Sequence, residues 1–303
     1  MFPNLKYHVL MNVIVFIWGF TGILGKIIQL NFDQIVFFRL ILSGLSLFLY
    51  LALTRKNYII RDKKSAIKVF GIGILVTLHW LLFYKAIQVS SASLAVLCLA
   101  TTTLHVSWIE PIVMKQKFSI QEFIFGLLVI AGIAFVSGNI DATQLEGVFW
   151  GLCAAVTAAC FSVFNLKMKR KGISSSSITL YEMFSGFFFL VIILGFQGKF
   201  DSHFFQMTMS DFWWLMFLSV ICTSIAYLLM IEVVDKLGAF TASLSINLEP
   251  VYSILLAIPI LHENEILNSK FYFGAAFIVL VIIMNPIVKN WMEKKGNKSS
   301  LIS

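Results

Sequence analysis

The residues of this chain that could take part in chemistry lie inside apolar segments, where a polar side chain is unfavourable unless it has a partner or a function. Glu249 and Pro250 fall in the middle of the apolar stretch 238–263, with Asn247 close to them. An ionised side chain at the centre of a bilayer costs about 3 kcal/mol or more, and a proline removes a helical hydrogen-bond donor. We interpret the stretch as one wall of a polar cavity, in which Glu249 could exchange a proton.

A second group of candidate cavity residues is aromatic. His79, Trp80 and Tyr84 fall within the segment 67–87 at spacings that place them on adjacent helical faces, where they could stack on a substrate and form hydrogen bonds. The alternative is a histidine satisfied by a neighbouring helix and, for Tyr84, a place in the aromatic belt at the membrane surface. Tyr227 is a further candidate, or makes an ordinary bond between helices.

A polar stripe follows in the segment 91–113. Thr101, His105 and Trp108 recur there with Cys98 at helical spacing, on an otherwise apolar helix. We predict that Thr101, His105 and Trp108 line the cavity, although a threonine can instead bond the backbone of its own helix.

Three ionisable residues are candidates for gating. Glu110 stands near the inner end of its segment, where it could close an inner gate, reach water or pair with Lys115. Arg39 and Glu182 fall at mirrored depths in their segments, so each could close one side in turn. The alternatives for Arg39 and Glu182 are a fixed ion pair, or side chains that extend to the nearer membrane surface.

No metal or cofactor site is expected from the sequence. The glycine-rich run 19–26 has five residues between Gly19 and Gly25 and lacks the Ser or Thr that ends a phosphate-binding loop. His262 and Glu263 begin like a zinc-binding motif but the second histidine is absent. We therefore expect neither ATP hydrolysis nor a bound metal.

The elements that position these residues are predicted to be membrane-spanning helices. The chain has 303 residues, of which 59% are hydrophobic and 13% charged, whereas a soluble domain has about 25% charged residues. About 20 mostly apolar residues span a bilayer. Ten segments qualify: 8–28, 34–54, 67–87, 91–113, 120–138, 147–166, 177–197, 212–233, 239–261 and 270–289. This predicts an all-α integral membrane protein with ten transmembrane helices, the first being a true span and not a signal peptide.

The basic residues support this count. With the N-terminus inside, the inner segments contain most of the 23 Lys and Arg residues, as cytoplasmic loops do. We therefore expect a multi-pass protein of the plasma membrane (the inner membrane in bacteria), with both termini cytoplasmic. The net charge of +8 is spread over separate loops, which argues against a nucleic-acid partner.

The two halves of the chain resemble each other weakly. A shift of 148 residues places Thr101 on Glu249, and a shift of 141–143 places Arg39 opposite Glu182. Five spans per half is an odd number, so the second half would be inverted, as in many transporters. We predict a first five-helix repeat over 1–140 and a second over 141–303, which ends in a short basic cytoplasmic tail.

Several short motifs carry a family resemblance. They are Trp18-Gly19, Lys26, Arg39, the run A-S-L-x-x-N-L-E-P-V at 242–251, and Glu263. With the ten spans, they make the chain similar to the EamA-type transporters of the drug/metabolite transporter superfamily. Thr102 and His262 depart from the residues usual in that family. The resemblance implies export or exchange of small metabolites, often amino acids, across a plasma membrane.

The sequence thus predicts a secondary transporter that works by alternating access, with protons as the candidate coupling ion. The partners would be a small-molecule substrate and the lipid bilayer, and no cofactor. The competing interpretation is an intramembrane enzyme acting on a lipid-borne substrate. An enzyme would cluster its acid and base groups near one interface, whereas the polar residues here are spread through both halves. We therefore expect a protein that is not an enzyme.

Overall fold

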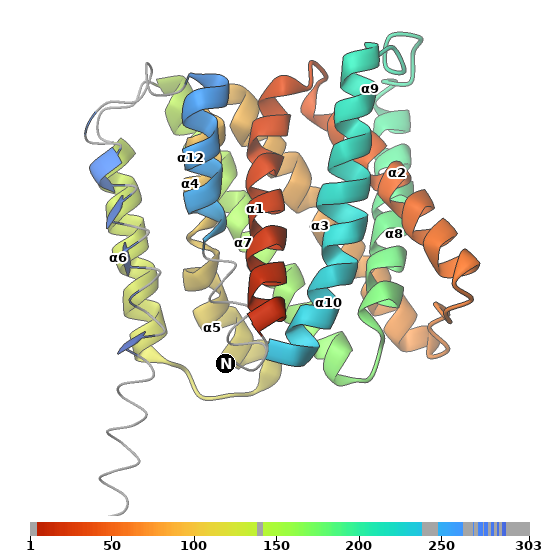
Figure 1. Cartoon of the computed structure of the whole chain (residues 1–303), viewed down its shortest axis with the longest axis horizontal. Helices are drawn as coiled ribbons and strands as arrows, with labels where there is room; N and C mark the ends of the chain where they lie inside the picture. Colours follow the sequence, from red (N-terminus) through yellow and green to blue (C-terminus); the bar gives the residue numbers. More distant parts are fainter. Residues whose placement is uncertain are drawn as a thin grey trace, which may run out of the picture.

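The computed structural model describes residues 5–137, 142–237 and 248–262, and positions 269, 272–274, 276–277, 280–281, 284 and 287–288. In these residues all regular secondary structure is helical, and the helices stand side by side as a bundle (Figure 1). In chain order they are α1 (Leu5–Ile27), α2 (Phe32–Leu53), α3 (Lys63–Val89), α4 (Ala92–Leu99), α5 (Thr102–Met114), α6 (Ile120–Ser137), α7 (Ala142–Arg170), α8 (Ser175–Phe196), α9 (Met209–Met216), the π-helix η1 (Phe217–Ile225), α10 (Ala226–Leu237) and α12 (Glu249–Leu261).

Many of these helices suit a bilayer. Six segments are long and apolar enough to cross it: Leu5–Ile27, Phe32–Leu53, Lys63–Val89, Ala92–Met114, Gln144–Arg170 and Ser175–Phe196. Shorter apolar helices cover Met209–Ile225 and Val251–Leu261. The all-helical membrane architecture is therefore confirmed. The count of ten spans stays a prediction, and every described position from 269 to 288 is helical where the tenth span is expected.

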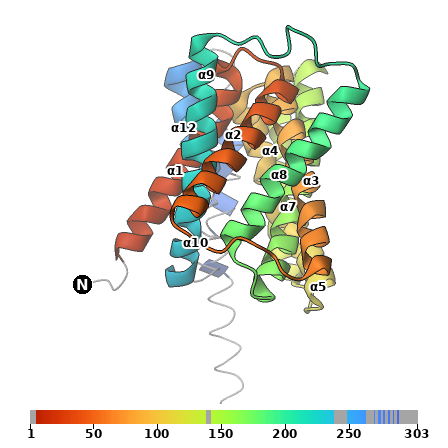
Figure 2. The same ribbon diagram turned by 90° about the vertical axis from the view of Figure 1, so that its right-hand side faces the viewer.

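The two ends of the bundle differ in their connections. The α1–α2 and α8–α9 connections lie at the upper end, and the α2–α3 and α7–α8 connections at the lower end (Figures 1 and 2). At the lower end Asp62 caps α3, because its carboxylate accepts hydrogen bonds from the backbone N–H groups of Lys64 and Ser65. Ser174 caps α8 in the same way.

Two helices are interrupted where the sequence predicts continuous spans. The segment 91–113 is split between Leu99, which ends α4, and Thr102, which begins α5. α12 begins at Glu249, directly after a turn at Leu248, so Glu249 does not lie inside one unbroken helix. Pro250 explains why α12 begins at Glu249, because a proline is tolerated in the first turn of a helix, where its missing N–H is not needed. The preceding residues 238–247 lie outside the described part.

The short helices α5 and α12 share their form. Each has 13 residues and an internal proline, Pro111 or Pro259. Each ends at a residue in the left-handed conformation, Lys115 with φ 55° and His262 with φ 53°. In Figure 1, α5 occupies the lower half of the bundle and α12 the upper half. The alignment of these helices, Thr102 with Glu249, is one residue away from the predicted shift of 148.

A second alignment of the chain with itself, shifted by 143 residues, pairs two longer helices. It carries α2, from Phe32 to Leu53, onto α8, from Ser175 to Phe196, and each has 22 residues. Arg39 and Glu182 then occupy the same position of their helices. The same shift carries Tyr84 of α3 onto Tyr227 of α10, and Trp80 onto Thr223 of η1.

Candidate functional site

Arg39 is the buried charge around which several polar side chains gather. It lies on α2 and is 4% exposed. Its guanidinium carbon lies 3.8 Å from the centre of the Trp80 ring. Its Nε donates a hydrogen bond to Thr223 Oγ1 at 3.0 Å, and Nη1 donates to the Tyr84 hydroxyl oxygen, also at 3.0 Å. Three helical segments, α2, α3 and η1, therefore meet at this side chain.

The π-helix presents one of these partners. Thr223 Oγ1 accepts from Arg39 while donating to the carbonyl oxygen of Leu218, five residues earlier, at 2.9 Å. Ser224 Oγ makes the equivalent bond to Ser219 at 3.2 Å. Such wide turns are rare and frequently occur at functional sites. On α3, Trp80 and Tyr84 are one helical turn apart, so the ring and the hydroxyl reach Arg39 from one face.

No ion pair compensates Arg39 in the described part of the chain. The ion pairs there join Lys85 with Glu146 and Lys199 with Asp33. A guanidinium group has five donors and no acceptor, and a buried charge without a counter-ion is unfavourable. The Trp80 ring offsets part of the cost of burying this charge, since a desolvated cation–π contact contributes about 2 kcal/mol. The arrangement therefore favours a ligand with an anionic group.

Two acidic residues lie near this site without contacting Arg39. Glu249, the first residue of α12, is half-buried, and Arg39 acts on it electrostatically. Tyr227 lies within electrostatic range of Arg39, Glu182 and Glu249. The Tyr227 ring also packs against Trp18, with centroids 5.8 Å apart. Charges of both signs thus border the same interior region.

His79 and Thr101, which the sequence predicts to line the cavity, make the contacts given above as their alternatives. His79 contacts a neighbouring helix, and Thr101 bonds the backbone of its own helix. His79 is 8% exposed, and its Nδ1 lies 2.9 Å from the carbonyl oxygen of Ala154 on α7. Its ring stacks on Phe83. Thr101 is fully buried and donates to the carbonyl oxygen of Cys98 at 2.7 Å. By contrast, the surface-belt position considered for Tyr84 does not occur, because that side chain is fully buried.

The α5 residues stand apart from Arg39. His105 and Trp108 meet edge to face with ring centroids 6.3 Å apart, and Trp108 is 38% exposed. Glu110 is half-buried and takes part in neither of the two ion pairs of the described residues. α5 packs against α6 and α7. Asn247, another predicted cavity residue, lies outside the described residues.

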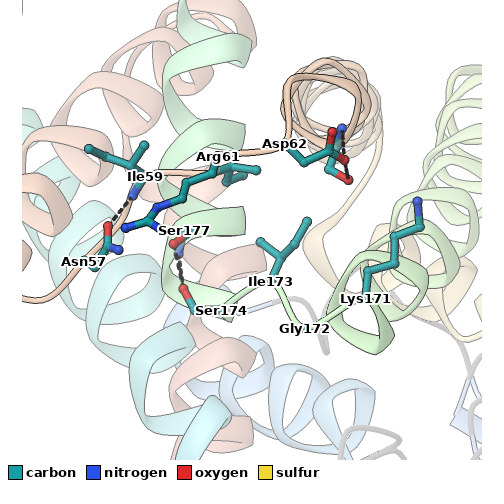
Figure 3. Close-up of a pocket in the computed structure, with 11 residues that line it drawn as sticks. Asn57, Ile59, Arg61, Asp62, Lys171, Gly172, Ile173, Ser174 and Ser177 are labelled. Carbon is teal, nitrogen blue, oxygen red and sulfur yellow. Dashed lines mark hydrogen bonds between the residues drawn. The ribbon is translucent and has the colours of Figure 1, made fainter.

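A cavity of about 570 Å³ opens at the lower end of the bundle, between the α2–α3 connection and the α7–α8 turn (Figure 3). Arg61 and Lys171 line it together with Asp62. Hydrogen bonds from the side chain and backbone of Ser65 lower the pKa of the Asp62 carboxyl group below its ordinary value of 3.8. The cavity therefore contains charged groups of both signs.

At the upper end, contacts join α2 to the α8–α9 connection. Gln34 Nε2 donates to the carbonyl oxygen of Phe204 at 2.8 Å, and Lys199 pairs with Asp33. The ring of Phe37 packs on Phe204 with centroids 5.3 Å apart. These contacts tie the start of α2 to the α8–α9 connection.

Comparison with known proteins places this bundle in a family. The model of the EamA-like transporter family matches residues 5–138 and again residues 145–285. The chain belongs to the EamA-like transporter family. It is 26% identical over 286 residues to a protein of Bacillus subtilis (strain 168) named "Uncharacterized transporter YoaV", covering 90% of this chain and 94% of that protein. "Uncharacterized transporter YxxF" of the same strain is 24% identical over 254 residues, covering 81% and 79%.

A solved structure supports the fold of this EamA chain. It is described only as "Crystal structure of protein", superimposes with a TM-score of 0.67 at 14% identity, and covers 95% of this chain and 99% of its own. The family and the names of its relatives identify a membrane transporter, which sits in a lipid bilayer and binds small molecules. The predicted resemblance to EamA-type transporters is thereby confirmed.

Sequence reasoning missed one partner of Arg39 in the EamA chain. Thr223 is a single hydroxyl residue in an apolar helix, and such residues usually bond their own backbone. A signal was present, because the 143-residue shift places Thr223 opposite Trp80, another partner of Arg39.

Proposed function

We propose that this EamA transporter is a secondary transporter that exports or exchanges small metabolites such as amino acids by alternating access. The observation that carries the proposal is the buried guanidinium of Arg39, which has aromatic and hydroxyl partners but no ion pair with a described residue. It suits a substrate carboxylate. Glu249, within electrostatic range of Arg39, suits the ammonium group of the same substrate.

The two ends of the bundle support alternating access. At one end contacts tie two connections together, and the other end holds the cavity shown in Figure 3. A form in which only the cavity side is accessible would account for this difference. The internal repeats proposed for residues 1–140 and 141–303 are supported by the two family matches and by the equal lengths of α2 and α8.

The orientation follows from charge. Basic residues gather at the end that holds the cavity, among them Arg55, Lys56, Arg61, Lys63, Lys64, Lys169, Arg170 and Lys171. Since Lys and Arg are enriched on the cytoplasmic side, we propose that this end and both termini are cytoplasmic and that the membrane is the plasma membrane. The structure then represents an inward-facing form.

The remaining site residues keep proposed roles. Substrate contacts are assigned to His79, Trp80, Tyr84, Thr101, His105, Trp108, Tyr227, Asn247 and Glu249, and gating to Arg39, Glu110 and Glu182. His79 and Thr101 would have to leave their present backbone partners to reach a substrate. Glu249 is the coupling group that the sequence favours.

The test is counterflow in proteoliposomes loaded with unlabelled amino acids, one at a time, and supplied with a trace of the labelled compound outside. We expect saturable uptake for at least one amino acid. Arg39→Gln should abolish it, because the variant removes the buried cation, whereas Arg170→Gln, an exposed control at the end of α7, should leave it unchanged. An absence of saturable flux for every solute, or full flux in Arg39→Gln, would contradict the proposal.

The coupling role of Glu249 has its own test. In Glu249→Gln, a pH gradient should no longer drive accumulation, because an amide cannot carry a proton. Full transport with an unchanged pH dependence in this variant would show that Glu249 is not the coupling group.

A further inference from the structure

A carboxyl group and an amide meet inside the bundle and leave two oxygen atoms without partners. Glu182, on α8, is 1% exposed, and the side chain of Asn165, on α7, lies close enough to act on its carboxyl group. Glu182 Oε1 and Asn165 Oδ1 are both buried, and neither has a hydrogen-bond partner within the described residues. Buried polar atoms in folded proteins are nearly always hydrogen-bonded, so this pair lacks a donor.

A proton is a donor that fits both oxygen atoms. A carboxylic acid and an amide can form two hydrogen bonds with each other, since the amide N–H donates to one carboxyl oxygen and the carboxyl O–H donates to the amide oxygen. One proton on Glu182 Oε1 would provide the second bond and engage Asn165 Oδ1 at the same time. The buried group would then carry no charge, whereas a bare carboxylate would need water or a cation.

The neighbouring helices supply no ion pair for Glu182 among the described residues. α8 packs against α2, α3, α7 and α10. Their titratable groups include Arg39 on α2, His79 and Tyr84 on α3, Cys153 and Cys160 on α7, and Tyr227 on α10. Toward the lower ends, where Asn165 and Glu182 lie, Lys68 of α3 is exposed and Lys167 of α7 donates to the carbonyl oxygen of Val113. Neither of the two ion pairs in the described residues includes Glu182. Arg39 is bound to Tyr84 and Thr223, and His79 is turned to the backbone of α7.

The pair lies behind the lower cavity. Ile60 and Ile173 line that cavity and also belong to an apolar cluster that contains Tyr181, the residue before Glu182. The Tyr181 hydroxyl oxygen accepts a bond from the Ile60 backbone N–H at 3.4 Å. The residue before Glu182 thus belongs to the apolar cluster beside the cavity.

We infer that Glu182 and Asn165 form the proton-binding site of this transporter. The inference rests on the proposed secondary transport, and it assigns the transported proton to Glu182 in place of Glu249, the residue that sequence reasoning favours for this role. A proton from water on one side adds to the Glu182 carboxylate at Oε1, and the O–H group donates to Asn165 Oδ1. On the other side that O–H bond breaks and the proton returns to water. In the first step an O–H bond of a hydronium ion breaks as the carboxyl O–H bond forms, and in the second step a water molecule takes the proton and becomes hydronium.

Infrared spectroscopy of the purified transporter in lipid nanodiscs tests the site without any substrate. The carbonyl band of a protonated, buried carboxylic acid should appear as the pH is lowered and disappear as it is raised. Glu182→Gln should remove this band, while Glu146→Gln, a control at a solvent-accessible carboxylate paired with Lys85, should keep it. Asn165→Leu should keep the band but move it to higher frequency, because the amide no longer bonds the carboxyl group.

Three results of this pH titration would overturn the inference. They are a wild-type protein without a titrating carboxylic-acid band, a band that is lost in Glu249→Gln but kept in Glu182→Gln, and a band that Asn165→Leu leaves unmoved. The Asn165 variant decides the matter if Glu182→Gln does not fold. A response of the Glu182 carboxylate to Na⁺ at constant pH, without a response to pH, would also overturn it.

The outcome is separable from that of the proposed function. If no solute is transported but the band behaves as expected, the proton site stands and the substrate class is wrong. If transport occurs, Glu182→Gln should retain counterflow exchange and lose accumulation driven by a pH gradient. Loss of gradient-driven accumulation in Glu249→Gln alone would assign the coupling to Glu249.

Discussion

Gly73 sits where α3 approaches α8 most closely, so replacing it with alanine should push the two helices apart. A Cβ atom added to Gly73 would lie 1.9 Å from Ser185 Oγ, 2.6 Å from the carbonyl oxygen of Glu182 and 2.7 Å from Glu182 Cα. The serine hydroxyl can rotate away, but the Glu182 backbone atoms move only with α8. Ordinary carbon–oxygen contacts are about 3.3 Å, so the helices must separate by about 0.7 Å.

A matched control lies two residues earlier on the same helix. Gly71 is exposed, and a Cβ atom added there would meet nothing within 4 Å. Both substitutions gain about 0.8–1 kcal/mol of helix propensity, so the difference between them isolates the packing. Overpacking of this kind costs about 1–3 kcal/mol. Gly73→Ala should therefore be less stable than Gly71→Ala by about that amount, as measured by unfolding in mixed micelles with increasing SDS.

A double variant tests which atoms are responsible. Removing the hydroxyl with Ser185→Ala should restore little stability to Gly73→Ala, because the Glu182 backbone contacts remain. Equal stability of the two glycine variants would refute the close approach of α3 and α8. Full rescue by Ser185→Ala would show that the hydroxyl, not the backbone, limits the approach.

Two further predictions concern the charged groups. Arg39→Lys keeps the charge but loses the flat guanidinium that stacks on Trp80 and bonds two hydroxyl groups, so substrate flux should fall at least tenfold while Arg170→Lys has no effect. Asp62→Ala should destabilise the protein at neutral pH, because hydrogen bonds, above all from Ser65, lower the folded-state pKa of Asp62 below 3.8. That contribution is present above pH 3.8 and is lost as the pH falls through the folded-state value, so thermal unfolding of wild type and variant should converge in acid; a constant gap would contradict it.

The spans could be predicted because they depend on composition alone. A run of about 20 apolar residues has few stable alternatives in a membrane, and the six segments long enough to cross agree with their predicted positions. Arg39 and Glu182 were recognisable for the same reason, because an ionisable residue within such a run is rare. Both prove to be buried, at 4% and 1% exposure.

The partners of these residues could not be predicted. His79 lies on α3 with Trp80, yet it turns to α7 while Trp80 turns to Arg39. Which way each side chain faces depends on the rotation of the helix against its neighbours, and this is decided by packing over the whole bundle. The break between Leu99 and Thr102 also has no local signal, since neither proline nor glycine occurs there.

The relation between Arg39 and Glu182 explains how one scaffold could couple two ligands. The two residues occupy the same position of equal helices, so the proposed inverted repeat would place them at mirrored depths in the membrane. If both were arginine, the two halves would favour the same kind of ligand and would compete for it. Opposite charges instead favour an anion at one position and a proton at the other. Exchanging the two residues, in Arg39→Glu combined with Glu182→Arg, should then abolish both functions, because Trp80 and Thr223 suit a guanidinium and Asn165 suits a carboxyl group.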